Sequence, residues 1–337
     1  MTDAIHPERA DWSILSEPSH ITVDRAPCIV FGYHDLGYVC IEALLGLGAP
    51  IRALFTHRDD PGEEIWWRSC AQLAAEHDVP VYTDEEFGPD WIDKLRRWAP
   101  AVIYSFNYRR LLPREILDCA SIGAFNVHPS KLPAYRGRAP INWVLVNGER
   151  ETGVTLHYMV ARADAGDIIG QQSVAIEDSD TALTLSRKLT PLAADLIRRF
   201  HPLIVAGRAP RHPQDLSAGS YFGRRTPADG RIDWNWPARR IFNLVRAVTH
   251  PYPGAFCSVA GRKLFIWQAS IGTEHGCIGE PGRIVSSVAS GLEVAAGAGS
   301  VVVSRVQFEG GQEGFAPEVL ALSKAPVAVV EANLKLV

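Results

Sequence analysis

The chain has 337 residues, a length typical of about two domains of ~150 residues each. Its hydrophobic fraction of 47% is ordinary for a globular protein, and its net charge of −4 excludes the strong positive field that general nucleic-acid binding needs. No uncharged apolar run approaches the roughly 20 residues of a membrane helix. The six cysteines form no C-x-x-C pair, which indicates reduced thiols. We therefore expect a cytoplasmic protein, most simply an enzyme.

The N-terminal half of the chain alternates predicted strands with predicted helices. Residues 1–26 carry prolines and charges but little apolar pattern, and we interpret them as an N-terminal extension. Short apolar runs predict strands at 26–33, 51–56, 80–82, 101–106 and 123–127. Helices are predicted between them at 39–47, 63–77, 91–98 and, briefly, at 116–117. This alternation predicts an α/β fold with a Rossmann-like, doubly wound parallel sheet, although the dinucleotide fingerprint G-x-G-x-x-G is missing.

The pattern changes toward the C-terminus. Two further strands at 153–160 and 168–176 precede a long predicted helix at 181–205, which we expect Pro191 to kink or split. After a linker, one helix is predicted at 238–250, followed by β-type segments at 255–259, 263–269, 282–287, 292–295 and 301–308. These segments predict a small, OB-like C-terminal β barrel. We divide the chain into the extension, a catalytic domain at 27–215, a β-barrel domain at 220–325 and a tail at 326–337.

The densest group of polar residues follows the fifth predicted strand, where ligands bind in parallel sheets. Asn126 and His128 are two residues apart, so on a strand their side chains point to the same side. Asp164 lies on the loop between the two later strands, and we expect it to approach His128. A histidine with an amide and a carboxylate can accept a proton from an attacking amine and stabilise an oxyanion. No nucleophile elbow is present, so direct acyl transfer is favoured.

These residues also have purely structural interpretations. Asn126 and His128 are compatible with ordinary positions at the end of a strand, and Asp164 with a turn before Ala-Gly. Arg224 and Arg225 suit a charged surface loop as well as a phosphate site, which arginine binds in a bidentate manner. The residue pattern alone leaves these alternatives open.

Several motifs together resemble the 10-formyltetrahydrofolate-dependent formyltransferases. They are N-x-H-P-S with L-P and Y-R-G at 126–137, G-V-T-L-H at 153–157, and D-A-G-D-I-I at 164–169. The motifs occur in the order and at the spacing of that family, and the resemblance covers about residues 27–325. It implies Asn126, His128 and Asp164 as the catalytic residues, with Asn126 donating to the formyl oxygen. It also implies 10-formyltetrahydrofolate as the formyl donor, without a metal.

The resemblance further implies which residues contact the two substrates. The donor is expected to be held mainly by backbone groups at Arg109, Arg110, Leu111, Leu112, Val160 and Asp164. The diphosphate of a nucleotide-linked acceptor is expected to be held by Arg136, Arg138, Arg224 and Arg225. His157 lies mid-strand, where a place in the core or a role in supporting the catalytic residues is favoured over catalysis.

Within the family, the likeness is greatest to the formyltransferase half of the bifunctional polymyxin-resistance enzyme of lipid A modification. It implies UDP-4-amino-4-deoxy-L-arabinose as the acceptor. However, residues 129–132 are Pro-Ser-Lys-Leu where that branch has Gly-Ser-Leu-Leu, and the decarboxylase half is missing. Another amino sugar, a natural-product precursor, methionyl-tRNA, hydrolysis of the donor and a non-catalytic binding module therefore stay as alternatives. The expected partners are small molecules, with neither a membrane nor nucleic acid, and the oligomeric state is not predicted.

Overall fold

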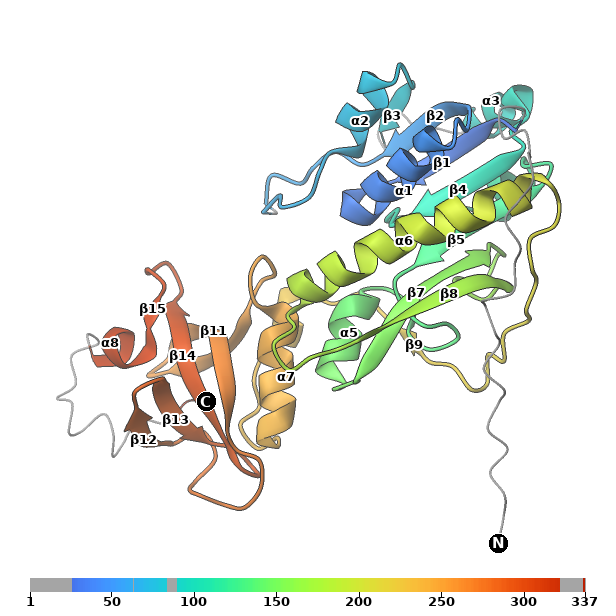
Figure 1. The fold of residues 1–337 in the computed structure, drawn as a ribbon. Coiled ribbons are helices and arrows are strands. Elements are labelled where there is room, and N and C mark those ends of the chain that lie inside the picture. The colour runs from blue at the N-terminus through green and yellow to red at the C-terminus, as the bar shows by residue number, and fades with distance from the viewer. Residues whose placement is uncertain (1–25, 63, 84–89, 322–335, 337) are drawn as a thin grey trace, which may run out of the picture.

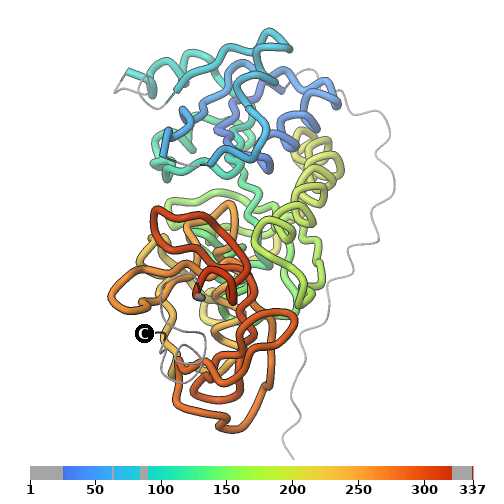
Figure 2. Tube along the Cα trace, turned by 90° about the vertical axis from the view of Figure 1, so that its left-hand side faces the viewer, coloured from blue at the N-terminus to red at the C-terminus, as the bar shows by residue number. Residues whose placement is uncertain are grey.

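The computed structural model describes residues 26–62, 64–83, 90–321 and 336. Within these ranges the chain forms two lobes, an N-terminal α/β domain and a C-terminal antiparallel β domain (Figures 1 and 2). The predicted extension up to residue 25, and the predicted tail apart from Leu336, lie outside the described residues.

A seven-stranded sheet in the order β3-β2-β1-β4-β5-β7-β8 forms the centre of the N-terminal domain. Its strands are β1 (Cys28–Gly32), β2 (Ile51–Thr56), β3 (Val81–Thr83), β4 (Val102–Phe106), β5 (Gly123–His128), β7 (Glu151–Tyr158) and β8 (Ile168–Ala175). The first five are parallel, which confirms the predicted doubly wound sheet. β7 and β8 extend it in antiparallel orientation, a feature that the spacing of the strands does not reveal.

Helices cover both faces of this sheet (Figure 1). α1 (His34–Gly46), α2 (Cys70–Glu76) and α6 (Ala182–Val205) pack on one face, and α3 (Trp91–Trp98) and α4 (Arg114–Leu117) on the other. Successive residues of β1 alternate between the two cores, since Cys28 and Val30 join the first and Ile29 and Phe31 the second. Burial on both faces is why the strands are continuous apolar runs rather than alternating ones.

Several helices differ from their predictions: α1 begins at His34 where the prediction began at residue 39, and α5 (Pro140–Val146) was not predicted. α2 begins at Cys70, and the preceding Trp66 and Trp67 lie in a loop, where both rings pack at 4.4 Å from the ring of His34. α6 continues through Pro191 as one 24-residue helix, so the predicted split is wrong. The helix predicted from the spacing of these tryptophans with Cys70, Leu73 and Ala74 therefore forms only from Cys70 onward.

The C-terminal domain is an antiparallel sheet in the order β10-β11-β14-β13-β12, with β15 paired to β14. The strands are β10 (Ala255–Val259), β11 (Arg262–Thr273), β12 (Ile284–Val288), β13 (Gly291–Ala295), β14 (Ser300–Phe308) and β15 (Gly314–Phe315), and α8 (Ala316–Ala321) follows. The separate β domain predicted from the sequence is confirmed. Between the lobes lie α5 (Pro140–Val146) and α7 (Ala238–Val248), two helices that contact each other (Figure 1).

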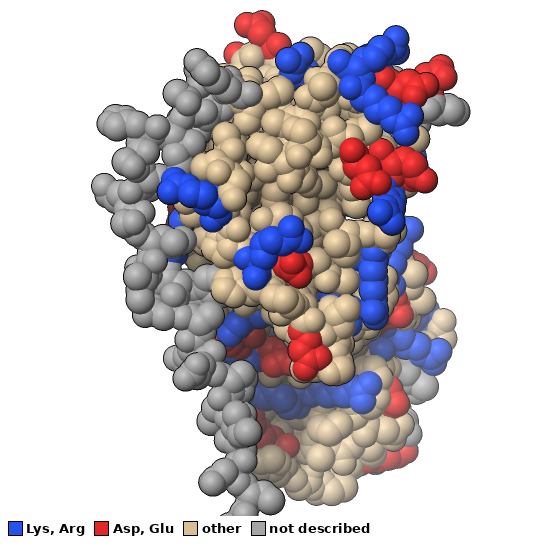
Figure 3. Space-filling model, turned by 90° about the vertical axis from the view of Figure 1, so that its right-hand side faces the viewer, with Lys and Arg blue, Asp and Glu red and all other residues tan. Residues whose placement is uncertain are grey.

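The surface shows no segregation of charge on the face drawn in Figure 3, where cationic and anionic side chains intermingle. This distribution agrees with the small net charge of the chain. Within the described ranges, every helix is too short or too polar to span a membrane.

Candidate active site

The carboxyl end of β5 and the loop between β7 and β8 bring three predicted residues together. His128 Nδ1 lies 3.6 Å from Asp164 Oδ1, and Asn126 Nδ2 donates to the same oxygen at 3.3 Å. His128 is 5% exposed and the Asp164 side chain 13%. A nearly buried carboxylate thus faces an imidazole and an amide, which is the arrangement expected from the sequence.

A main-chain carbonyl fixes the protonation of the His128 ring. His128 Nε2 lies 2.8 Å from the carbonyl oxygen of Tyr135, which can only accept a hydrogen bond, so Nε2 carries a hydrogen. The Thr155 hydroxyl holds the intervening loop, because it donates to the Ser130 carbonyl at 2.7 Å and accepts from the Leu132 amide at 3.1 Å. Nδ1, which faces Asp164, is therefore the ring atom at which a proton can come and go.

His157 is a fourth member of this group, for which the sequence predicts a place in the core or a role in supporting the catalytic residues. Its Nδ1 lies 2.8 Å from the carbonyl oxygen of Tyr158, so Nδ1 is protonated and the neutral ring presents Nε2 as an acceptor. Asn126 Nδ2 lies 3.1 Å from that Nε2. Asn126 and His157 are register partners in the antiparallel pairing of β5 with β7. Knowledge of this pairing would have been sufficient to predict that His157 belongs to the site.

The two contacts of the Asn126 amide group change the role expected for it. Both amide hydrogens are directed to protein groups, one to His157 and one to Asp164. The amide oxygen, an acceptor, is then the atom left to meet a substrate. This orientation does not provide the expected donation to a formyl oxygen.

The carboxyl group of Asp164 is held in its ionised form. Burial by itself raises the pKa of Asp164, but the neighbouring His128 and His157 and the Gly137 N–H, which donates at 2.9 Å, together bring that pKa well below its ordinary range. Gly137 has a φ of +99°, and a Cβ at this position would lie 2.2 Å from the Phe222 carbonyl oxygen. Only glycine therefore brings this N–H to Asp164 without strain.

A pocket of about 1080 Å³ opens over these residues, at the carboxyl ends of β1, β2, β4 and β5. The predicted donor-binding residues all line it: Arg109, Arg110, Leu111, Leu112, Val160 and Asp164. The side chains of Leu111 and Val160 are 62% and 43% exposed, which is high for apolar residues. They give the pocket an apolar wall that is open to a ligand.

Three of the four arginines predicted to hold the acceptor line the same pocket. Arg138 donates to the main-chain oxygen of Arg109 at 2.7 Å, and Arg224 is exposed. Arg225 lies over the Trp143 ring, with its guanidinium carbon 4.6 Å from the ring centre. Cations from two distant segments therefore border one opening.

Arg136 is the exception, because the structure places it away from the pocket, in contrast to its predicted contact with the acceptor. Its side chain is only 4% exposed and its guanidinium donates to the carbonyl oxygens of Pro133 and Leu216. The short parallel pairing of β6 (Arg136–Gly137) with β9 (Tyr221–Phe222) encloses it. Arg136 holds the loop together instead of facing the pocket.

Three aromatic side chains form a wall of the pocket that is not predicted from the sequence. His57 stacks on Tyr108 at 4.3 Å and meets the edge of Tyr33 at 5.2 Å. The Arg109 amide donates to His57 Nε2 at 2.9 Å, and the Tyr33 hydroxyl donates to Asp59 at 2.8 Å. Tyr33, His57 and Tyr108 each follow the end of a parallel strand, which is the position that would have marked them.

Two family models match the chain in succession. A model described as formyl transferase matches residues 46–199, and a model of the formyl transferase C-terminal domain matches residues 224–322. The boundary between the two matches falls in the segment that leads from the large sheet to α7.

Solved structures of similar fold include an N-formyltransferase from Helicobacter canadensis in complex with folinic acid and dTDP-3-aminofucose. It is 20% identical with a TM-score of 0.66, over 82% of this chain and 98% of that chain. WlaRD, a sugar 3N-formyl transferase in the presence of dTDP and 5-N-formyl-THF, is 19% identical with a TM-score of 0.63, over 85% and 98%. HypX from Aquifex aeolicus in complex with tetrahydrofolic acid is 18% identical with a TM-score of 0.59, over 89% of this chain but 48% of HypX.

Proposed function

Because the chain belongs to the formyltransferase family, we propose that it transfers a formyl group from 10-formyltetrahydrofolate to the amine of a nucleotide-linked amino sugar. The observation that carries this proposal is the buried group of Asn126, His128 and Asp164 beneath a large open pocket. Three proteins of similar fold have folate derivatives in their solved structures, one of them with a dTDP-linked amino sugar. A pocket of about 1080 Å³ has room for two such ligands.

The proposed reaction needs one proton relay and no covalent enzyme intermediate. The acceptor amine attacks the formyl carbon, a new C–N bond forms, and the bond from that carbon to N10 of the folate breaks. His128 Nδ1 takes the proton that the amine loses, and the ionised Asp164 stabilises the resulting imidazolium. The same proton passes to N10 as tetrahydrofolate leaves. The Asn126 oxygen accepts an N–H of the attacking amine and so aims its lone pair.

The two substrates are assigned to different walls of the pocket. Leu111 and Val160 offer exposed apolar surface for the flat ring of the donor, with main-chain groups beside them. Arg138, Arg224 and Arg225 offer charge for the acceptor diphosphate, since arginine forms paired hydrogen bonds with phosphate oxygens. For the acceptor we propose UDP-4-amino-4-deoxy-L-arabinose, on the sequence likeness described above.

A formyl-transfer assay against a panel of acceptors tests the proposal. The panel contains UDP- and dTDP-linked 4-amino sugars, glycinamide ribonucleotide, methionyl-tRNA and a reaction without acceptor. We expect selective use of the UDP-linked 4-amino sugar. Preference for a dTDP-linked sugar would change the nucleotide and leave the reaction class intact. Release of tetrahydrofolate without any acceptor would instead make the protein a hydrolase, and formylation of methionyl-tRNA would overturn the sugar assignment.

We also propose the domain boundaries at 27–215 and 220–325 and a cytoplasmic location. The boundaries are supported by the two sheets and by the two family matches. The location is supported by the cysteines, which are free in the described structure: Cys28, Cys40, Cys70, Cys119, Cys257 and Cys277. Free thiols are typical of a reducing compartment.

A further inference from the structure

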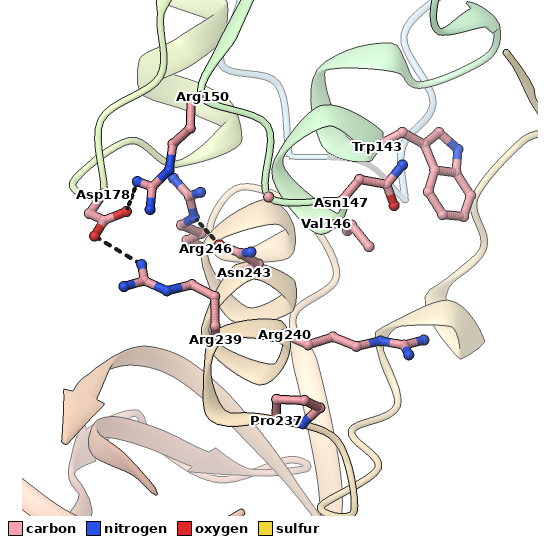
Figure 4. A pocket seen from close by; sticks show the side chains of 11 residues that line it. Trp143, Val146, Asn147, Arg150, Asp178, Pro237, Arg239, Arg240, Asn243 and Arg246 are labelled. Carbon is pink, nitrogen blue, oxygen red and sulfur yellow. Dashed lines mark hydrogen bonds and ion pairs between the residues drawn. The ribbon is translucent and has the colours of Figure 1, made fainter. Parts of the chain in front are cut away.

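A second pocket, of about 640 Å³, lies between the two lobes and is lined mainly by α5, α7 and Arg150 (Figure 4). The start of α5 borders the catalytic pocket at Pro140, whereas its later residues Trp143 and Val146 border this second pocket. The formyl-transfer chemistry described above uses none of the second pocket's lining residues.

Four arginines line this pocket against a single carboxylate. Asp178 accepts from Arg150 Nη1 and from Arg239 Nη1, both at 2.9 Å (Figure 4). Arg239 also pairs with Glu274, which lies outside the lining. Figure 4 shows Arg240 extending from the other side of α7, away from Asp178. The carboxylates of Asp178 and Glu274 thus offset two of the four guanidinium charges, and the pocket keeps an excess of two positive charges.

Arg246 is a buried cation without a carboxylate partner among the described residues. It is 6% exposed, and its Nε donates to Asn243 at 2.9 Å. Nη1 donates to the main-chain oxygens of Glu177 at 2.8 Å and Asp180 at 3.3 Å. Its Nη2 has no hydrogen bond within the described ranges. Burial lowers the pKa of this guanidinium, because a charge removed from water is disfavoured, while the charges of Asp178 and Asp180 oppose that shift.

The start of α7 adds to this positive field. Arg239 and Arg240 occupy its first turn, which has no acidic residue, and Pro237 caps it without a side-chain hydrogen bond. Cations at this end of a helix oppose the helix dipole, whereas an anion there is stabilised by it. The guanidinium carbon of Arg240 lies 3.9 Å from the centre of the Trp236 ring, which holds this side chain in place. An anionic ligand would offset the unfavourable placement of Arg239 and Arg240 at the start of α7.

We propose that this pocket between the lobes binds the diphosphate group of a small molecule, separately from the substrates in the catalytic pocket. Arg240 and Arg246 supply the uncompensated charge, and Arg150 closes the rim. A diphosphate matches the excess of two positive charges and the planar donors of arginine better than a single carboxylate does. A free pyrophosphate and a nucleoside diphosphate share this chemistry.

Calorimetric titration with inorganic pyrophosphate at low salt tests the site. The double variant Arg150→Ala/Arg240→Ala is expected to bind at least tenfold more weakly than the wild type. Arg198→Ala, which removes an exposed arginine of α6 outside both pockets, is expected to bind like the wild type. Arg224→Ala removes a cation of the catalytic pocket, where the acceptor diphosphate is proposed to bind, and is expected to leave unchanged the binding event that the double variant weakens. Thermal unfolding of all variants checks that they are folded.

The outcomes separate this proposal from the proposed function. Unchanged binding by the double variant, loss in Arg224→Ala of the same binding event that the double variant weakens, or no binding by the wild type would each overturn the site. Repeating the titration with ADP and UDP distinguishes the two sources of the diphosphate. If either nucleotide binds more tightly than pyrophosphate and the double variant weakens that binding, the ligand is a nucleotide. If both nucleotides bind with the affinity of pyrophosphate, the ligand is a free polyphosphate. Formyl transfer by the double variant is expected to stay at the wild-type rate, so failure of the assay panel would not affect this result.

Discussion

His128 Nε2 lies 2.8 Å from the main-chain carbonyl oxygen of Tyr135, and this contact decides how the ring can act. Nε2 must donate, so Nδ1 is the ring nitrogen with a free lone pair, and it is the one that faces Asp164 at 3.6 Å. Hydrogen bonds to Thr155 hold the loop that carries the carbonyl. The loop therefore selects the ring nitrogen, and the carboxylate stabilises the charge that forms on the ring.

Replacing His128 by glutamine separates these two functions of the ring. The glutamine amide can still donate to the Tyr135 carbonyl, but it has no titrating nitrogen beside Asp164. We expect a decrease in kcat of roughly 10²–10⁴-fold, the usual contribution of general acid–base catalysis, with a melting temperature close to that of the wild type. Steady-state kinetics and thermal unfolding measure both. A His128→Gln variant with more than a tenth of the wild-type kcat would contradict the proton relay.

Asp164→Asn removes the negative charge while keeping the shape of the side chain and its acceptor for the Gly137 N–H. We expect kcat at pH 7 to fall by roughly 10²-fold or more. The lowered pKa of Asp164 also stabilises the fold above its ordinary pKa of 3.8, and this stabilisation is lost as the pH falls below that value. The free energy of unfolding should therefore decrease less steeply below pH 4 in the variant. Equal slopes in urea unfolding would show that Asp164 is not stabilised in the fold.

His157→Leu tests whether this buried histidine positions Asn126. The change removes the acceptor 3.1 Å from the Asn126 amide and frees that amide to rotate. We expect kcat to decrease about tenfold, corresponding to the loss of about one hydrogen bond, with little change in the KM of either substrate. His157→Gln, which can place an oxygen near the lost nitrogen, should recover part of the activity. An equal loss in both variants would indicate a packing role only.

Gly137→Ala addresses the donor that reaches Asp164 from the loop. An alanine Cβ would lie 2.2 Å from the Phe222 carbonyl and would adopt an unfavourable positive φ. We expect the free energy of unfolding to fall by about 1–3 kcal/mol and kcat to fall with it. Gly46→Ala is the matched control, because no atom lies within 4 Å of its added Cβ and α1 gains a better helix former. Chemical unfolding of both variants gives the comparison.

Local pattern is sufficient to predict much of this site. The spacing of Asn126 and His128 on a strand, and the position of Asp164 on a nearby loop, bring the three together because the carboxyl ends of parallel strands share one edge. His157 could not be assigned in the same way, since its contact depends on an antiparallel pairing. Arg136 was misplaced because its direction is set by pairing with a segment about 85 residues away.

The same distinction explains the fold. The parallel core and the β domain follow from the period and length of apolar runs, which are local properties. The orientation of β7 relative to β5 is set by the route of the connecting chain, which carries α5 and no full crossover. The segment before α2 is predicted to be helical from the spacing of Trp66 and Trp67 with Cys70, Leu73 and Ala74. Both tryptophans instead pack against His34, a residue on another segment.

His201 lies on α6, within the core and away from the site. It is 0% exposed, its Nδ1 lies 2.7 Å from the Tyr104 hydroxyl, and its Nε2 is buried without a partner in the described structure. Burial lowers its pKa from 6.5 to about 4, so the folded protein keeps this ring neutral at a pH where the unfolded chain protonates it. The contribution to stability is complete above pH 6.5 and is lost as the pH falls toward 4.

A difference of this size corresponds to about 3 kcal/mol of unfolding free energy between pH 7 and pH 4. His201→Asn, whose amide can keep the hydrogen bond to Tyr104, should lower stability at pH 7 but remove most of this pH dependence. Urea unfolding of the wild type and the variant at pH 7 and pH 4.5 measures it. The decrease in unfolding free energy should be smaller in the variant by more than 1 kcal/mol. Parallel decreases would show that His201 accepts a proton in the folded protein as readily as in the unfolded chain.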